Sequence, residues 1–185
     1  MTEYFSFDIP STNLEDFVNH WSSCYSDAAR DRDYYDPHIG KNLQTDWEAL
    51  LKLYEWKNGS TLSHKKKESV CKNYFKDWVE DADLEARYLS DSSKGGEIWN
   101  IFYLHCRRPD YYPIYDQHTD RAMRYIQTGS ICAAFIRGRR NIFRAYQSEY
   151  RPFVGHLRQQ RFELRKIDRA LFAFGQFLKL AKPYT

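Results

Sequence analysis

The chain lacks several features that mark common classes of protein. No apolar run among its 185 residues approaches the roughly 20 residues that a membrane-spanning helix needs. Its N-terminal residues show neither the basic start nor the apolar stretch of a signal peptide. The sequence therefore predicts a cytoplasmic protein that has no membrane partner.

Clustered cysteine is also missing. The four cysteines (Cys24, Cys71, Cys106 and Cys132) are scattered, and none belongs to a Cys-x-x-Cys pair. Zinc and iron–sulfur sites depend on such clusters, so neither is expected. We expect reduced thiols, no bound metal and no cofactor.

Strand patterns are few, whereas helical periodicity runs through most of the sequence. Apolar side chains recur every three or four positions in residues 14–21, 47–54, 70–78, 98–104 and 164–178. A chain of this length forms one domain in most cases. We therefore expect an all-α fold in which residues 1–185 form a single compact multi-helix domain.

Turn-forming residues predict where these helices end. Asn58 and Gly59 are typical of a left-handed helix C-terminus. Residues 27–41 are rich in aspartate but match no EF-hand spacing, so we expect a solvated acidic loop. A helix over residues 142–149 is expected to stop before Pro152, and the last helix is expected to run unbroken over residues 157–180.

Charge divides the chain into two halves. Residues 1–92 carry 11 Lys and Arg against 18 Asp and Glu, a net charge of −7, whereas residues 93–185 carry 17 against 7, a net charge of +10. Most cations of the basic half are arginines, which bind phosphate through two parallel hydrogen bonds and stack on bases. Two interpretations follow: the basic half is a nucleic-acid surface, or it docks against the acidic half.

The most informative segment is Pro109-Asp-Tyr-Tyr-Pro-Ile-Tyr-Asp116 and the residues after it. Pro113 interrupts the aromatic stretch, so this stretch is neither a central strand nor the middle of a helix. Asp116 is well placed to cap the helix that begins at Gln117. A capping carboxylate is either purely structural or a rigidly held chemical group at the positive end of a helix.

The motif Asp116-Gln-His118-Thr-Asp-Arg121 resembles the Asp-x-His-(Val/Thr)-x-Arg signature of the helix-hairpin-helix DNA glycosylases, the endonuclease III superfamily. An apolar helix over residues 98–104 and a Pro-containing turn precede it, in the order that the family shows. This likeness covers about residues 89–124. Together with Asp116, residues 164–172 are also similar to a group of uncharacterised bacterial proteins.

The resemblance implies an all-α enzyme that excises a base from DNA. Asp116 would be the catalytic carboxylate, and Lys94 lies near the place where lyase members carry a Schiff-base lysine. Ser92, Gly95 and Gly96 stand where the family's hairpin grips a phosphate, although its Leu-Pro-Gly-Val-Gly sequence is absent here, as are its iron–sulfur cysteines. We expect the remaining contacts with nucleic acid to come from His118, Arg121, Arg124, Arg139 and Arg140.

Two other functions fit the same sequence. The first is a nucleic-acid-binding module that has the same fold and no catalytic activity. The second is a helical protein-interaction protein of bacterial defence or phage biology, whose acidic and basic halves pair with each other or with a partner. The sequence leaves the oligomeric state open.

Overall fold

The computed structural model describes residues 14–131, 135, 138–159 and 161–181, and every regular element in these ranges is helical. This confirms the predicted all-α class. The acidic half contains α1 (Leu14–Ser23), α2 (Ala28–Arg30), η1 (Asp31–Tyr35), α3 (Trp47–Asn58), α4 (His64–Val70), η2 (Cys71–Phe75), η3 (Asp81–Asp83) and α5 (Leu84–Tyr88). The basic half contains α6 (Glu97–Arg107), α7 (Gln117–Thr128), α8 (Arg139–Ala145), η4 (Tyr146–Tyr150), α9 (Arg151–Arg158) and α10 (Leu164–Leu180).

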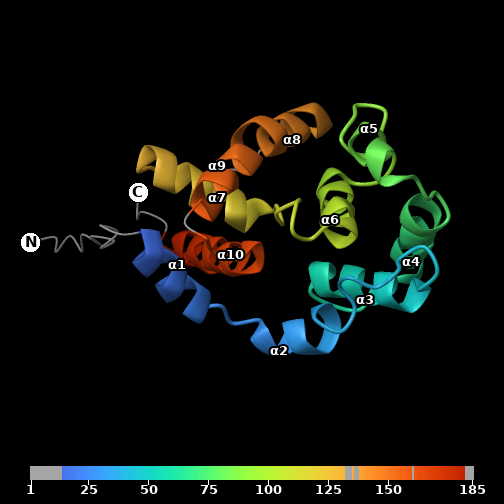
Figure 1. Cartoon of the computed structure of the whole chain (residues 1–185), viewed down its shortest axis with the longest axis horizontal. Coiled ribbons are helices and arrows are strands. Elements are labelled where there is room, and N and C mark those ends of the chain that lie inside the picture. Colours follow the sequence, from blue (N-terminus) through green and yellow to red (C-terminus); the bar gives the residue numbers. More distant parts are fainter. Residues whose placement is uncertain (1–13, 132–134, 136–137, 160, 182–185) are drawn as a thin grey trace, which may run out of the picture.

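The helices form two groups that face each other (Figure 1). One group is centred on α10, which packs against both α1 and α7. The other group contains α3 to α6, and buried tyrosine rings such as Tyr54, Tyr74 and Tyr103 stack in its core. The segments that join the two groups, before α3 and before α7, therefore run between two packed bodies.

A glycine sets the distance between α7 and α10. A Cβ atom at Gly175 would lie 2.0 Å from the main-chain oxygen of His118, so only glycine fits at this crossing. Arg121 of α7 donates a hydrogen bond of 3.0 Å to the Gly175 carbonyl of α10. The start of α7 and the middle of α10 are thus held against each other.

The expected acidic loop is wrong in its first half. Residues 28–35 form α2 and the π-helical turn η1, and Asp31 is fully buried. Its carboxylate accepts hydrogen bonds from Tyr25 (2.9 Å), from the Trp56 indole (2.8 Å) and from Arg165 and Arg169 of α10. The partners lie far away in the sequence, so local composition did not reveal a buried, fully paired carboxylate.

Two predicted helix boundaries are also wrong. The helix continues through Pro152, because the π-helical turn η4 precedes it and the Arg151 amide donates to the Tyr146 carbonyl five residues back. Proline is tolerated in the first turn of α9, which starts there. The long final helix is split instead: α9 ends at Arg158, Arg161 has a positive φ of 65°, and α10 begins at Leu164.

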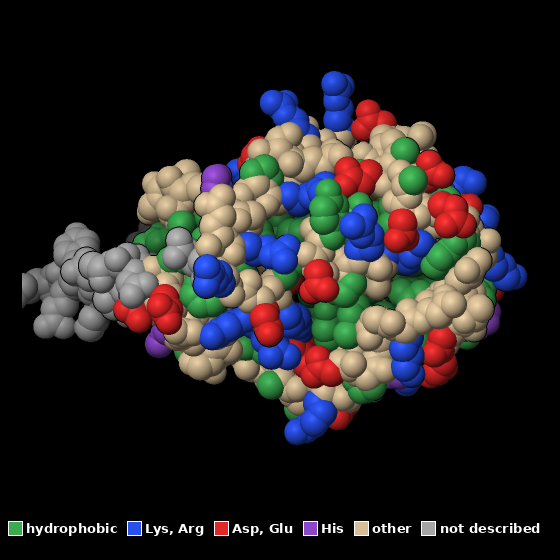
Figure 2. All heavy atoms as spheres, in the orientation of Figure 1, with side chains coloured by type: hydrophobic (Ala, Val, Ile, Leu, Met, Phe, Trp, Pro, Cys, Tyr) green, Lys and Arg blue, Asp and Glu red, His purple; other side chains and the backbone are tan. Residues whose placement is uncertain are grey.

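Several arginines of the basic half pair with carboxylates of the acidic half. The pairs are Arg107–Asp81, Arg151–Glu85, Arg165–Asp31 and Arg169–Asp31. On the face drawn in Figure 2, Lys and Arg side chains are interspersed with Asp and Glu rather than gathered in one patch. Part of the opposite charge of the two halves is therefore paired within the molecule.

Within the described ranges, none of the helices has both the length and the apolar character needed to cross a membrane.

Candidate functional site

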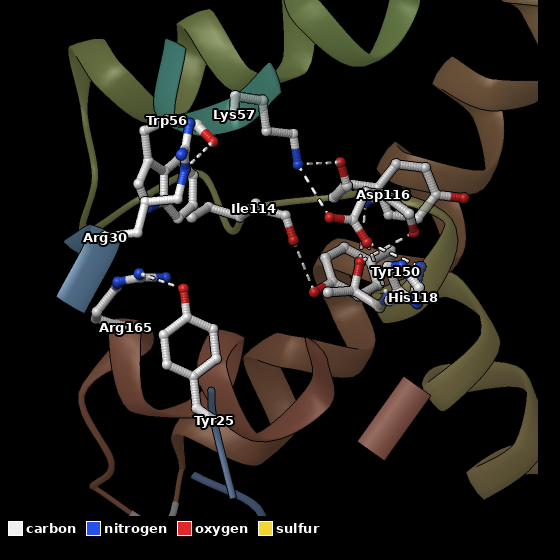
Figure 3. A network of polar contacts seen from close by, with 11 residues as sticks. Tyr25, Arg30, Trp56, Lys57, Ile114, Asp116, His118, Tyr150 and Arg165 are labelled. Carbon is white, nitrogen blue, oxygen red and sulfur yellow. Dashed lines mark hydrogen bonds and ion pairs between the residues drawn. The ribbon is translucent and has the colours of Figure 1, made fainter. Parts of the chain in front are cut away.

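A cavity of about 420 Å³ opens between the two groups of helices. It is bordered by the end of α3, the starts of α6 and α7, the first half of α10 and the segment around α2 (Figure 3). Aromatic, cationic and acidic side chains share its wall: Tyr25, Arg30, Trp56, Lys57, Trp99, Asp116, His118, Phe135, Arg165, Asp168 and Phe172. A mixed wall of this size is typical of a site for a small molecule or for part of a larger one.

Asp116 caps α7, as the sequence predicts. Its Oδ1 accepts from the amides of His118 (2.8 Å) and Thr119 (3.1 Å), and the Asp116 amide donates to Thr119 Oγ1 (2.9 Å). This reciprocal capping box fixes the orientation of the carboxylate. Its second oxygen, Oδ2, stays available for another partner.

That partner is Lys57, at the end of α3. Its Nζ lies 3.1 Å from Asp116 Oδ2, and the two side chains are only 8% and 17% exposed. Burial alone would raise the pKa of Asp116, but the Lys57 ammonium and the main-chain amide of Thr119 outweigh it and hold the pKa below its usual value. Asp116 is therefore an ionised, partly shielded carboxylate at neutral pH.

A second carboxyl, Asp168 of α10, lines the same cavity. Its residue is 2% exposed, and neither oxygen has a hydrogen-bond partner of good geometry among the described residues. Burial raises its pKa to about 7, against the opposing charge of Arg165 and the amide of Ile114. The sequence carried a signal for Asp168, because it lies four residues after Leu164 and three before Leu171, inside an apolar stripe.

Two arginines at the cavity are held by other groups. Arg30 donates to the main-chain oxygens of Glu55 and Trp56. Arg165 pairs with Asp31, and its guanidinium lies 4.4 Å from the centroid of the Tyr35 ring. These contacts place fixed positive charge at the wall opposite the start of α7 (Figure 3).

His118 and Arg121, both predicted from the motif, lie close together. Arg121 Nη1 is 3.3 Å from His118 Nδ1, and the His118 ring meets Phe172 edge to face. Burial, aided by Arg121, lowers the pKa of His118 despite the nearby Asp116 carboxylate. His118 is therefore a neutral side chain in the cavity wall, and Arg121 joins α7 to α10.

Lys94 is not among the residues that line the cavity. It borders a separate surface depression with Ser92, Asp77 and Arg87, so the lysine beside Asp116 is Lys57. The sequence showed no pattern that relates Lys57 to Asp116, because they meet only in the tertiary fold, where the end of α3 lies close to the start of α7. The end of α3 at Gly59, whose φ is +79°, was predictable, but its position in the fold was not.

The other predicted nucleic-acid contacts lie in other surroundings. Gly96 caps α6, and the Gly95 carbonyl accepts a hydrogen bond of 2.7 Å from Arg139. Arg124 pairs with Asp120 (2.9 Å) and with Glu149 (3.6 Å). Arg140, by contrast, is exposed on α8.

No cluster of three or more potential metal ligands occurs in the part of the chain that the structure describes. Comparisons of the chain with protein-family models, with curated protein sequences and with solved structures return no match.

Proposed function

We propose that this protein is a divergent helix-hairpin-helix glycosylase that hydrolyses the N-glycosidic bond of a nucleotide in DNA, with Asp116 as the catalytic carboxylate. The observation that carries the proposal is the state of Asp116: rigid, ionised and placed in the wall of a cavity lined by aromatic rings. The resemblance of the Asp116–Arg121 motif to the DNA glycosylases implies the same role for this residue.

The cavity has the chemistry needed to receive a base that has left the stack. Rotating a nucleotide out of a duplex costs a few kcal/mol, and contacts with the rings of Trp56, Trp99 and Phe172 would offset this cost. Arg30 and Arg165 place positive charge at the same wall, where it favours the approach of a phosphate backbone.

Asp116 suits the chemical step because that step develops positive charge on the sugar. When the bond between C1′ and the base nitrogen breaks, its electron pair leaves with the base and the sugar becomes an oxocarbenium ion. A fixed carboxylate stabilises this ion and takes a proton from the water that adds to C1′. A low pKa keeps Asp116 ready for this role.

Lys57 acts as a positioning residue in this proposal. Its ammonium group is paired with Asp116 and lies 3.4 Å from the Tyr115 carbonyl, so it serves the carboxylate rather than attacking the sugar. Schiff-base chemistry needs a neutral amine. Lys94, the other candidate for this chemistry, borders a different depression of the surface. The arrangement therefore favours a hydrolase over a lyase.

The test is cleavage of a panel of single-stranded and duplex oligonucleotides that carry common base lesions. Asp116→Asn keeps an oxygen for the cap, since asparagine is a good N-cap residue, and we expect it to abolish excision while preserving binding. Asp110→Asn, at an exposed position, is the matched control and should cleave like the wild type.

Other outcomes would replace the proposal. Binding that weakens steeply with salt, without cleavage, would indicate a nucleic-acid-binding module. Neither binding nor cleavage would direct the search to protein partners. Equal cleavage by wild type and Asp116→Asn would remove Asp116 from the mechanism.

A further inference from the structure

We infer that Asp168 is a second catalytic residue of this cavity, a general acid that gives its proton to the departing base. This inference rests on the proposed function and narrows its substrate class. A base that needs a proton to leave is neutral while attached to the sugar, so the substrate would carry a neutral base rather than an alkylated, cationic one.

The position of Asp168 supports its role as a general acid. Asp168 of α10 and Asp116 at the start of α7 both line the cavity. Both carboxyl oxygens are buried and lack a hydrogen-bond partner of good geometry among the described residues. Buried polar groups are almost always paired, so an unpaired carboxyl in a cavity wall indicates a partner that arrives with the ligand.

The fold holds the two carboxyls in fixed positions. Asp116 begins α7 and Asp168 lies in α10, and these helices are in contact at Gly175, one turn beyond Phe172. The hydrogen bond from Arg121 to the Gly175 carbonyl joins the same two helices. The geometry of the pair is therefore set by the framework rather than by a loop.

The electrostatic surroundings of the two carboxyls favour an ionised Asp116 and a protonated Asp168. Asp116 has an ammonium partner and main-chain donors, which favour its ionised form. Asp168 is desolvated, and its pKa of about 7 leaves much of it protonated at neutral pH. The charged and titratable groups that act on or with Asp168 come from several elements: Arg165 of α10, Lys57 of α3, Asp116 before α7, Tyr35 of η1, and Tyr146 and Tyr150 of η4. Two carboxyls whose pKa values differ in this way are suited to act one as an acid and the other as a base.

The step balances without a further reactant. The C1′–N bond breaks and its electron pair stays on the base, which takes the proton from the Asp168 carboxyl and leaves neutral. The oxygen of one water molecule bonds to C1′, and a proton of this water passes to Asp116. Asp116 then loses that proton to solvent and Asp168 regains one, so that the net reaction consumes only water.

The experiment compares two leaving groups in otherwise identical oligonucleotides. One carries a neutral purine, and the other carries the same purine methylated at N7, which is already cationic and needs no proton. Single-turnover cleavage is measured for wild type, Asp168→Asn and Asp116→Asn across pH 5–9. The thermal stability of each variant is recorded, because asparagine matches the shape of aspartate and should preserve the fold.

We expect Asp168→Asn to lose roughly 100-fold or more on the neutral purine, the usual size of a general-acid effect, and to stay within a few-fold of wild type on the methylated one. Wild-type cleavage of the neutral purine should fall as the pH rises through about 7, and Asp168→Asn should lack this fall. Asp116→Asn should lose both substrates, because both pass through the same sugar cation.

Four results would overturn the inference. Equal loss on both purines in Asp168→Asn would make the residue structural, and unchanged cleavage of the neutral purine would remove it from the reaction. A wild type that cleaves only the methylated purine would show that no acid is needed, with the proposed function still standing. If the wild type cleaves no base in any oligonucleotide, the proposed function fails and the inference fails with it.

Discussion

The α7 wall and the α10 wall of the cavity each carry a shielded carboxyl, yet the two groups have opposite acid–base character. Asp116, at the start of α7, has its pKa held below the usual value, whereas that of Asp168 in α10 is raised to about 7. Burial acts on both in the same direction. The difference comes from the hydrogen bonds and charges that reach each carboxylate, so burial alone does not decide whether a carboxyl is ionised.

The same contrast makes the two carboxyls respond oppositely to pH. A lowered pKa in the folded state, as for Asp116, contributes stability at neutral pH that is lost as the pH falls. A raised pKa, as for Asp168, contributes stability that is full below about pH 4 and is lost as the pH rises toward 7. Variants that change the surroundings of Asp116 or of Asp168, one at a time, can separate the two contributions to stability.

The largest expected effect is on the pH dependence of stability in Asp168→Asn. Relative to this variant, the wild type should lose about 4 kcal/mol of unfolding free energy between pH 4 and pH 8, because three pKa units correspond to that amount. Urea unfolding at several pH values measures it, with Asp110→Asn as the exposed control. Parallel pH curves for wild type and Asp168→Asn would mean that Asp168 titrates normally.

Lys57→Met should remove the difference in pKa between Asp116 and Asp168, because the variant lacks the cation that is paired with Asp116. We expect a loss of roughly 2–3 kcal/mol at pH 7, near the lower end for a broken buried ion pair, since Asp116 is not fully buried. The loss should shrink at acid pH, where Asp116 becomes protonated. The exposed Lys65→Met is the control, and an equal change in both variants would contradict the role of the pair.

Gly175→Ala should push the two walls apart. The new methyl group would meet the His118 main chain at 2.0 Å, and overpacking of this kind costs roughly 1–3 kcal/mol. Gly155→Ala in α9 has open space around its Cβ position and should be neutral or slightly stabilising. Thermal unfolding of the two alanine variants measures the difference, and equal melting temperatures would show that the α7–α10 contact yields easily.

The smallest effect is expected for Thr119→Val, which tests how much the capping box at the start of α7 contributes to stability. Valine keeps the shape of threonine but removes the acceptor for the Asp116 amide, at a cost of about 1 kcal/mol. Thr128→Val, at the exposed end of the same helix, is the matched control. Chemical denaturation of both variants provides the measurement; a smaller loss in Thr119→Val than in its control would argue against the capping box.

The sequence predicted those parts of the fold that depend on neighbouring residues. The cap at Asp116 and the helix end at Gly59 follow from local backbone preferences, and both occur in the structure. The same local rules misplaced the boundary at Pro152, because the wider π-helical turn before it changes which amides need partners.

The candidate site was predictable only in part. Asp116, His118 and Arg121 belong to one motif and lie close together at the start of α7, where Asp116 and His118 line the cavity. Lys57 and Asp31 reach their partners through tertiary packing, and no spacing in the sequence encodes these contacts. A charged residue inside an apolar stripe, as at Asp168, is a signal that sequence reasoning can use.

The pairing of α1 with α10 has a consequence for how the protein is made. Phe17 near one end of the chain meets Phe174 near the other, with ring centroids 5.3 Å apart, and Trp21 also packs on Phe174. A ribosome releases α1 long before it has synthesised α10, so the apolar side of α1 waits without its partner while the intervening helices emerge. Chaperone binding to nascent chains should therefore persist until α10 leaves the exit tunnel.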